Sequence, residues 1–417
     1  MDVATLRTLV LNGGSSSWKS ALFADIAADM PARDASALES EAAVALSWRA
    51  AGAPARLEGR APGGRSLARD VAVARDGAAV AAMLDAYREL GVDPETFAAV
   101  GHRIVHGGAR FSASVAIDDG VIAALRELEP LAPSHVPIEV AGIEAITRAL
   151  PHVPQVAAFD TAFHRTLPSH AATYGGPYEW LADDIRRYGF HGINVAYCVE
   201  RLSSVLSRDA ADVRCVVAHL GGGCSLTAVR DGRSVDTSMG FTPLDGVVMG
   251  TRSGAVDPGI LLYLLRRAPD ERAGDAASRL DALLNHSSGL LGLSGRSGDV
   301  RDLLAATANG DDRARLALDV FVYRVATAIG AMLPALERLD ALVFTGGIGE
   351  HAGVLRARIC ERLGFAGVSL DAERNGNRDA STDGDVSLAG AAVRAVVIAA
   401  REEWYVAREC ARVAAAG

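Results

Sequence analysis

The sequence contains no uninterrupted apolar run of about 18 or more residues, the length that a membrane-spanning helix needs. This holds although 50% of its 417 residues are hydrophobic. Residues 1–11 include one acidic and one basic side chain and lead directly into a turn rich in glycine and serine, which is not the pattern of a secretory signal peptide. We therefore expect a cytoplasmic protein that makes no membrane contact.

An excess of basic residues is also absent. The formal net charge is −9, whereas nucleic-acid-binding proteins usually carry a basic surface, so we expect no nucleic-acid partner. A local cationic pocket for a small anion remains compatible with this charge. The cysteines have no metal-ligand spacing, and we expect them to be buried thiols in a reducing compartment: Cys198, Cys215, Cys224, Cys360 and Cys410.

The Gly-x-x-x-x-Gly-Lys-Ser/Thr motif of P-loop enzymes is missing as well. The sequence Gly346-Gly347-Ile348-Gly349 follows a predicted strand and precedes a predicted helix, as a dinucleotide-binding turn does, but it lacks the full Gly-x-Gly-x-x-Gly spacing. A plain turn is the default interpretation of one such loop. Three glycine-rich loops at predicted strand ends favour anion binding over three unrelated turns.

Two of these loops are the tips of predicted hairpins, at Leu9–Lys19 and Val216–Thr227. Because small residues occupy both tips, backbone N–H groups can approach an anion closely. The first hairpin adds the polar side chains of Asn12, Ser15, Ser16, Ser17 and Lys19, and the second has His219 before Gly221, Gly222 and Gly223. Two such hairpins predict two related domains and a duplicated nucleotide-binding fold.

The pattern between the hairpins alternates strands and helices, which predicts an α/β architecture with helices covering the sheets. Residues 31–75 lack a clear pattern and are predicted as an irregular or hairpin excursion. A domain boundary is expected near residues 160–175. Predicted helices span 76–91, 118–129, 137–149, 259–267 and 312–333, the last ended by Pro334, with a charged helix from about Glu402. Predicted strands span 97–105, 153–159, 213–230 as a hairpin, 341–345 and 393–400.

Two arginines have unusually small neighbours. Arg252 lies near the end of the small-residue segment Asp236–Gly254, and Arg103 lies in Gly101–Gly108 at a predicted strand end. A guanidinium group in such a setting can turn onto a carboxylate or a phosphate. Either arginine alone would be interpreted as solvated, but the pair indicates an anion site.

Carboxylates and one histidine complete the candidate set. Asp160 follows a buried strand, where it could hold Mg²⁺ or cap the next turn, and Glu402 offers a second carboxylate or a helix-start charge. Asp299 is expected to cap a helix that runs to Gly310. His191 lies in a glycine-flanked turn and could donate a hydrogen bond to a phosphoryl group in transfer.

These motifs closely resemble the acetate and propionate kinase family of the actin, sugar-kinase and Hsp70 ATPase superfamily. The resemblance covers nearly the whole chain and is most specific at Asn12–Lys19, Gly101–Gly108, Phe159–His164, Asp236–Gly254 and Phe344–Glu350. It implies two duplicated RNase H-like domains with an inter-domain active-site cleft. It places the N-terminal domain at 1–163, with the 400–417 helix returning to it, and the nucleotide-binding and dimerisation domain at 164–399.

The resemblance also implies reversible phosphoryl transfer from ATP to a short-chain carboxylate by a homodimer, with Mg²⁺, or alternatively Mn²⁺, as the metal. Carried over by motif, the catalytic residues are Arg103, Asp160, His191 and Arg252, and the metal ligands are Asp160 and Glu402. The nucleotide side comprises Asn12, Ser15, Ser17, Lys19, His219, Gly221, Gly222, Gly223, Asp299, Arg301, Gly347, Ile348 and Gly349. The acyl pocket comprises Val105, Ser134, His135, Phe190 and Pro243.

The residue types suit this chemistry. A carboxylate substrate, with a pKa of about 4, is already ionised at neutral pH and needs no general base. Catalysis then requires charge cancellation between two anions and in-line positioning, which arginine, histidine and a divalent cation supply. A sugar kinase would instead use an aspartate to accept the proton of a hydroxyl.

The chain departs from the usual family sequence at two informative positions. Gly222 replaces the asparagine of Leu-Gly-Asn-Gly, which removes an amide on the nucleotide side. Ser134 replaces an apolar acyl-pocket residue. Two alternatives therefore stand beside an acetate or propionate kinase: a kinase of a different or larger short-chain carboxylate, and a catalytically weak nucleotide-binding paralogue.

Overall fold

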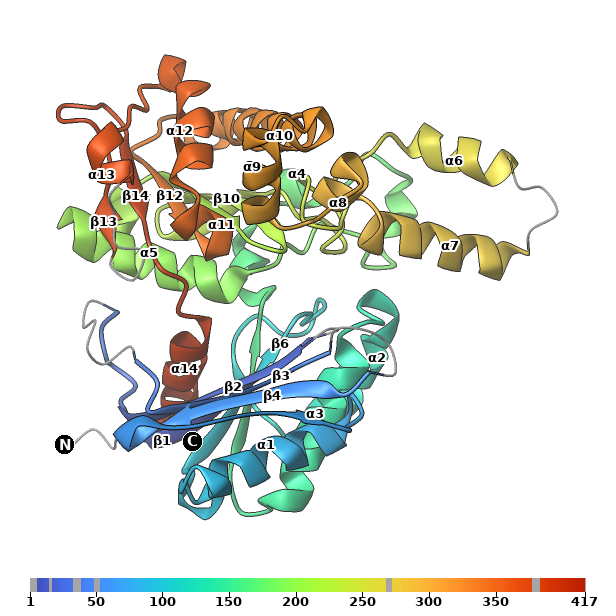
Figure 1. The fold of residues 1–417 in the computed structure, drawn as a ribbon, viewed down its shortest axis with the longest axis vertical. Coiled ribbons are helices and arrows are strands. Elements are labelled where there is room, and N and C mark those ends of the chain that lie inside the picture. The colour runs from blue at the N-terminus through green and yellow to red at the C-terminus, as the bar shows by residue number, and fades with distance from the viewer. Residues whose placement is uncertain are drawn as a thin grey trace. The chain divides into compact units, whose positions relative to one another are not determined.

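The computed structural model describes residues 6–14, 17–32, 39–48, 53–267, 272–376 and 383–416. The predicted site residue Ser15 and its neighbour Ser16 lie outside this set. The chain divides into two compact units (Figure 1). Unit 1 comprises Met1–Arg165, His191–Tyr197 and Arg401–Gly417, and unit 2 comprises Thr166–Phe190 and Cys198–Ala400.

Unit 1 is built on a mixed sheet with the strand order β5-β4-β3-β2-β1-β6-β8-β7. Strands β1 to β5 pair antiparallel in sequence order, while β1, β6 and β8 are parallel. The strands are β1 Leu6–Gly13, β2 Ser17–Ile26, β3 Ala42–Ser47, β4 Ala55–Ala61, β5 Arg65–Val71, β6 Ala99–Ile104, β7 Val115–Ala116 and β8 Gln155–Phe159. The hairpin interpretation of residues 31–75 is therefore confirmed where the structure describes them, because β3, β4 and β5 extend the sheet.

The helices of unit 1 begin where the sequence predicts. Asp76 accepts a hydrogen bond from the Ala78 N–H group, and Asp118 accepts one from the Val121 N–H group, so each carboxylate caps the helix that follows. The helices are α1 Gly77–Glu89, α2 Asp119–Glu127, α3 Val136–Ala149 and α14 Glu402–Ala416.

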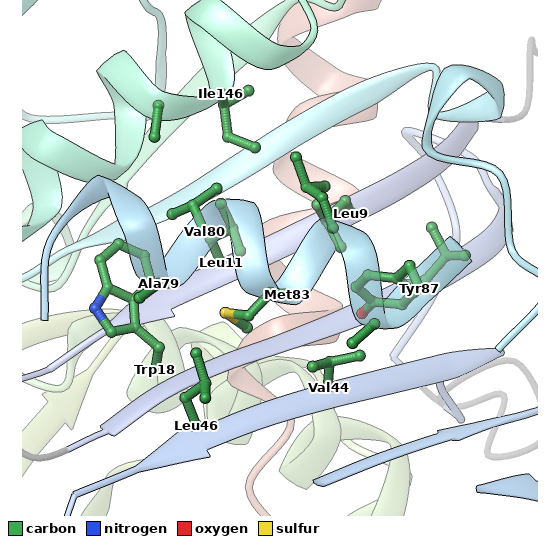
Figure 2. Packing of buried hydrophobic residues seen from close by; sticks show 14 of the residues in the cluster. Leu9, Leu11, Trp18, Val44, Leu46, Ala79, Val80, Met83, Tyr87 and Ile146 are labelled. Carbon is green, nitrogen blue, oxygen red and sulfur yellow. The ribbon is translucent and has the colours of Figure 1, made fainter. Parts of the chain in front are cut away.

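One face of this sheet is covered by α1 and α3. Figure 2 shows Val80, Met83 and Tyr87 of α1 facing residues of the central strands such as Leu9 and Val44. These residues belong to one buried cluster, which also contains Trp18 and Ile146. This packing holds β1 and β2, the two strands of the first hairpin, against the helices.

The opposite face is covered by α14, which approaches β6 closely. A β-carbon on Gly101 would lie 2.6 Å from Val406 Cγ1 and 2.7 Å from Cys410 Sγ. Only a glycine permits this distance, because real β-carbon contacts are longer. The approach brings the first turn of α14, with Glu402, to the end of β6.

Unit 2 contains a second mixed sheet with the strand order β11-β10-β9-β12-β14-β13. Its strands are β9 Cys215–Leu220, β10 Cys224–Arg230, β11 Arg233–Thr237, β12 Ala341–Thr345, β13 Gly384–Asp385 and β14 Arg394–Val397. The series β11-β10-β9 is antiparallel, and β9, β12 and β14 are parallel. The series β3-β2-β1-β6-β8 of unit 1 has the same order and directions, so the predicted duplication is confirmed.

The helices of unit 2 are α4 Ser169–Ala172, α5 Gly192–Leu206, α6 Pro258–Arg266, α7 Ala273–His286, α8 Gly289–Ser294, α9 Val300–Ala308, α10 Asp312–Leu336, α11 Gly346–His351, α12 Gly353–Glu361 and α13 Ala372–Gly376. Of these, α5 starts within the His191–Tyr197 segment of unit 1. Figure 1 shows α6 and α7 projecting from the remainder of unit 2.

The prediction that Pro334 ends the long helix is wrong. α10 continues to Leu336, and Glu337 ends it in the left-handed conformation with φ 63°. A proline so near the end removes one hydrogen bond but leaves the buried contact of Leu336 intact. α10 is also long and apolar enough to cross a membrane by length and composition. It buries a stripe that includes Leu318, Phe321 and Val325, as a core helix does.

Candidate functional site

Alternation along the strands of unit 1 places the predicted catalytic groups on one face. Ala99 on β6 packs against Cys410 of α14. Side chains alternate between faces with a period of two, so Arg103 lies on the same face as Ala99. The same reasoning places Asp160, which follows β8, and Asn12 at the end of β1 on the α14 face.

Arg103 is the centre of this group. Its Nε lies 3.1 Å from Asp160 Oδ1, its Nη2 lies 2.5 Å from Asp160 Oδ2, and its Nη1 donates to Asn12 Oδ1 at 3.0 Å. Glu402 Oε2 lies 3.7 Å from Arg103 Nε. The predicted catalytic arginine therefore lies between the two predicted metal-binding carboxylates, and the Asp160 pair is bidentate.

Burial and charge oppose each other at this arginine. Burial lowers the pKa of Arg103, but the nearby carboxylates of Asp160 and Glu402 more than offset this, so its pKa lies above the ordinary value. Burial raises the pKa of Glu402, while Arg103 and Lys19 act in the opposite direction. The site therefore holds the permanent cation of Arg103 next to the Glu402 carboxylate, and any further positive charge stabilises the ionised form of that carboxylate.

His191 has a strained backbone, with φ 59°. This left-handed conformation is uncommon for a residue with a side chain, and it clusters at functional sites. The next residue, Gly192, donates its N–H to the Asp160 carbonyl at 2.8 Å, and a β-carbon there would lie 2.3 Å from the same oxygen. The turn thus joins the backbone of His191 to that of Asp160 within unit 1.

The first hairpin presents its polar groups along β2. Lys19 pairs directly with Asn12 in the β1–β2 register and is exposed. Ser17 pairs with Ser47 and is half-buried. Of the predicted acyl-pocket residues in this unit, Val105 is buried just beyond β6, while Ser134 is exposed and His135 half-buried before α3.

In unit 2 the predicted nucleotide residues lie on glycine segments that touch each other. The Gly250 N–H donates to the Gly222 carbonyl at 3.3 Å. A β-carbon on Gly250 would lie 3.3 Å from the Gly298 carbonyl oxygen, and one on Gly346 would lie 2.8 Å from that of Leu220. Side chains would separate these segments, so the glycines allow the backbones to meet.

The remaining nucleotide-side residues flank these glycines. Gly221 lies near the Gly347 nitrogen and the His219 ring, since its β-carbon position is 3.8 Å from both. Gly347, Ile348 and Gly349 form the start of α11. Asp299 caps α9 by accepting from the Arg301 N–H at 2.8 Å and also pairs with the Arg301 guanidinium. The capping prediction for Asp299 is confirmed, and its role toward a nucleotide stays a prediction.

The loop from Thr237 to Asp245 carries Pro243 and meets the segment that carries Phe190. The N–H groups of Tyr188 and Gly189 donate to the Gly240 carbonyl at 3.0 and 3.4 Å. Two predicted pocket residues of unit 2 therefore lie on paired segments. Further along, Arg252 accepts from the Met249 N–H through its carbonyl at 3.1 Å, which closes the turn on which its side chain stands.

The sequence interpretation missed the residues that hold these segments. Arg187 donates from Nη1 to the carbonyls of Thr237, Ser238 and Met239 at 2.9, 2.9 and 3.1 Å. Arg356 is 2% exposed and donates to the carbonyls of Gly349 and Glu350 at the end of α11. Arg187 lies 50 residues before the first of the carbonyls that it binds, and Arg356 is buried and belongs to no recognisable motif. No local sequence signal therefore identifies either residue.

The donor set of unit 1 suits a divalent cation. Mg²⁺ is usually held by one or two carboxylates together with substrate phosphates and water. Asp160 and Glu402 supply two carboxylates on either side of Arg103. Among the described residues no three His, Cys, Asp or Glu side chains gather to hold a metal ion.

Known proteins resemble this chain over its whole length. A family model described as the Acetokinase family matches residues 7–408. The acetate kinase of Gloeobacter violaceus is 51% identical over 319 residues, 76% of this chain and 77% of that protein. The acetate kinase of Nostoc punctiforme is 43% identical over 416 residues, 97% of this chain and 98% of that protein.

Solved structures agree. The acetate kinase of Porphyromonas gingivalis superposes with a TM-score of 0.86 at 35% identity, covering 98% of this chain and 100% of that one. A propionate kinase from Francisella tularensis superposes with a TM-score of 0.85 at 36% identity, covering 97% and 98%. With the family match and the full-length relatives in agreement, the chain belongs to the acetokinase family.

Proposed function

We propose that the chain catalyses reversible transfer of the γ-phosphoryl group of ATP to acetate, giving acetyl phosphate and ADP. The observation that carries this proposal is the family match over residues 7–408. The Arg103–Asp160–Glu402 group supports it, because it supplies a fixed cation and two carboxylates at the end of β6. Propionate is a second substrate to test, since a propionate kinase superposes on the chain as well as an acetate kinase does.

The residues of unit 1 act on charge and position. Arg103 offers guanidinium N–H groups to the anionic substrate, and Asn12 and Asp160 orient that guanidinium. The His191 imidazole donates to the phosphoryl oxygens as negative charge spreads over them. No residue needs to remove a proton, because acetate attacks as its anion.

The residues of unit 2 bind the nucleotide in this proposal. The backbone N–H groups of Gly221, Gly222 and Gly223 face the phosphates, and Asp299 with Arg301 and Gly347–Gly349 lines the adenosine. Arg252 supplies the second cation at the phosphoryl group, and Phe190 and Pro243 are the acyl-side residues of unit 2. Val105, Ser134 and His135 are those of unit 1. Residues 1–163 with the 400–417 helix, and residues 164–399, are the two proposed domains.

The family uses ATP or ADP and a divalent metal ion. We propose Mg²⁺ as the metal, with Mn²⁺ as a substitute, because the oxygen-only donor pair of Asp160 and Glu402 suits these hard ions. When bound with the nucleotide, the ion supplies positive charge that offsets the charge on the phosphoryl oxygens. Asp160 and Glu402 hold it, and Arg103 keeps both carboxylates in place.

The proposed assembly is a homodimer in the cytoplasm, with no nucleic-acid or membrane partner. Support for self-association comes from α6, whose Ile260, Leu262, Tyr263 and Leu265 are all exposed. In the described chain α6 buries none of its residues, and a contiguous exposed apolar surface commonly marks a protein interface.

A panel of carboxylates tests the function. Purified protein with MgATP and acetate, propionate or butyrate is assayed for acyl phosphate by trapping with hydroxylamine. We expect the highest kcat/KM with acetate or propionate. The variant Arg252→Ala is assayed alongside, and its kcat should be lower on the order of 10³-fold if the arginine stabilises transition-state charge.

Two results would contradict the proposal in different ways. A larger acid preferred by tenfold or more would indicate a different carboxylate kinase, in line with the polar Ser134. Nucleotide binding by calorimetry without acyl phosphate above the no-enzyme control would indicate a binding paralogue.

A further inference from the structure

A buried carboxyl group lies beneath the Arg103 end of β6. Glu139, in the first turn of α3, is 3% exposed. Its neighbours along the helix, Val136, Val140 and Ile143, belong to an apolar cluster with Ile104 of β6. Glutamate is rarely buried among apolar side chains because its desolvation is costly, so this placement calls for a specific role.

One oxygen of this carboxyl holds the backbone at the end of β6. Glu139 Oε1 accepts a hydrogen bond from the Val105 N–H group at 3.1 Å. The other oxygen, Oε2, is buried and makes no hydrogen bond with the described residues. Val105 follows the last residue of β6, so without Glu139 its N–H would be buried and unpaired, which costs free energy.

The contact is positioned to influence both the arginine and the pocket. Arg103 stands two residues before Val105, and Asp160 donates its N–H to the intervening Ile104 carbonyl at 2.9 Å. Ser134 and His135 immediately precede α3, and Glu139 donates its own N–H to the His135 carbonyl at 3.0 Å. One side chain thus links the strand end that carries Arg103 and Val105 to the turn that carries Ser134.

Two further acceptors hold the same turn. The Gly107 N–H donates to Thr161 Oγ1 at 3.0 Å, and the Gly108 N–H donates to His106 Nδ1 at 2.9 Å. Glu139 differs from both because it reaches across from a helix on the face opposite α14. It therefore ties the end of β6 directly to α3.

We infer that Glu139 is a positioning residue for the carboxylate side of the reaction, acting through the Val105 N–H group on the placement of Arg103 and Val105. This inference rests on the proposed function. It concerns the acyl substrate and not the nucleotide, because Glu139 holds Val105, which is assigned to the acyl pocket, and not the Asn12–Lys19 hairpin of the same unit.

The test compares two substitutions. Glu139→Gln retains an oxygen acceptor of the same length, and Glu139→Leu keeps similar volume without an acceptor. We expect the Leu variant to raise KM for acetate about tenfold or more, as loss of a buried hydrogen-bond partner does, and to change KM for ATP less than about twofold. The Gln variant should restore KM for acetate to within about threefold of wild type.

Glu144 on the same helix is the matched control, since its partly exposed side chain pairs with Arg126 on the helix surface. Glu144→Leu should leave both KM values unchanged. Equal increases in KM for acetate and ATP in Glu139→Leu, or an unchanged KM for acetate, would overturn the inference while leaving the proposed function intact. A wild-type protein inactive on every carboxylate would instead remove the proposed function.

If circular dichroism shows that Glu139→Leu does not fold, Glu139→Asp takes its place, because its shorter side chain withdraws the oxygen from Val105. The inference then requires Asp to raise KM for acetate and Gln not to raise it. The same KM for acetate in both variants would overturn it.

Discussion

Gly222, where the resemblance predicts that an asparagine of the family is replaced, is a residue at which the structure leaves room. No atom of the described residues lies within 4 Å of its β-carbon position, and its φ is outside the left-handed region. We predict that Gly222→Asn fits without strain and lowers KM for ATP about tenfold, because a side-chain amide adds a hydrogen bond to a charged phosphate. Steady-state kinetics at saturating acetate measure this.

Gly364 provides the control for that substitution. Its β-carbon position is equally open, and it lies in a short turn at Gly364–Ala366. Gly364→Asn should leave KM for ATP unchanged. If Gly222→Asn also leaves KM for ATP unchanged, backbone N–H groups alone provide the hairpin's contribution to nucleotide binding.

Glu139 also makes the stability of the chain depend on pH. Burial raises its pKa from 4.5 to about 8, with the Val105 N–H and Arg103 lowering it and Asp160 raising it. The folded state therefore binds more protons than the unfolded state between these two values, so this contribution to stability is complete below pH 4.5 and is lost as the pH rises through about 8.

We predict that the free energy of unfolding of wild type, measured by urea denaturation, falls relative to that of Glu139→Gln by on the order of 3 kcal/mol between pH 5 and pH 8. Charged side chains of the neighbouring helices α1 and α2 pair elsewhere, Arg88 with Asp85 and Arg126 with Glu144. The imidazoles of His106 and His135 lie on the adjoining segments and are common to both proteins. Parallel curves for the two proteins would contradict a buried, neutral Glu139.

Sequence patterns predicted the hydrogen bonds of a single side chain only where its partner is close in sequence. Asp299 precedes α9 and accepts from its first turn, as predicted, and Asp76 does the same at α1 where the predicted 76–91 helix begins. Glu139 reaches Val105 across 34 positions, and Arg187 reaches Ser238 across 51. Such pairs follow from the packing of α3 and of the Thr237–Asp245 loop, which no spacing in the sequence records.

Among the structural elements, the Thr237–Asp245 loop depends most on one side chain. Besides its three carbonyl acceptors, Arg187 lies 3.4 Å from Asp245 and stacks over Tyr174, and Tyr174 Oη accepts from the Phe241 N–H at 2.8 Å. We predict that Arg187→Met lowers kcat/KM for acetate at least about tenfold, because three carbonyls lose their donor. Arg187→Lys should recover part of this.

The exposed Arg233 on β11 is the control for this loop. Kinetics and limited proteolysis of Arg187→Met and Arg233→Met should separate the two. The role of Arg187 is contradicted if both variants keep wild-type activity and the same cleavage pattern between residues 237 and 245.

Strands that are almost wholly buried were predictable, and the two strands at the β5 edge of the unit 1 sheet were not. β6, β8 and β12 are apolar runs and begin within three residues of the predicted positions. β5 forms the edge of the sheet and has no buried residue among its described positions, so it lacks the alternation of a half-buried strand. β4 does alternate and buries Ala55 and Leu57, but Leu57 is its only large apolar side chain. The pairing of β4 with β3 and of β5 with β4 depends on tertiary contacts.

At the scale of the whole molecule, the proposed homodimer can be tested on α6. We predict that Leu262→Glu on α6 converts a dimer into a monomer, because it places a charge on an apolar surface where Leu262 is 53% exposed. Light scattering after size-exclusion chromatography measures the mass. Leu388→Glu is the control, since Leu388 is 49% exposed elsewhere in unit 2, and a dimer that survives Leu262→Glu would place the interface away from α6.

The duplication was predictable because each half opens with the same glycine-tipped hairpin. β1–β2 and β9–β10 occupy equivalent places in their sheets, so two short motifs were enough to indicate two related units. The grouping of His191–Tyr197 with unit 1 was not predictable. It follows from the bond between the Gly192 N–H and the Asp160 carbonyl, which joins segments about 30 positions apart.

Lys19 is the only lysine among the 42 lysine and arginine residues of the sequence, and it is exposed at the first hairpin. The chain therefore carries a single ε-amine, which makes it a ready-made attachment point for an amine-reactive fluorophore. We predict that such a dye labels Lys19 alone among the side chains, as peptide mass spectrometry would show, and that MgADP slows the labelling while the α-amine serves as the reference. Labelling at Lys19 that MgADP does not slow would mean that this hairpin is not part of the nucleotide site.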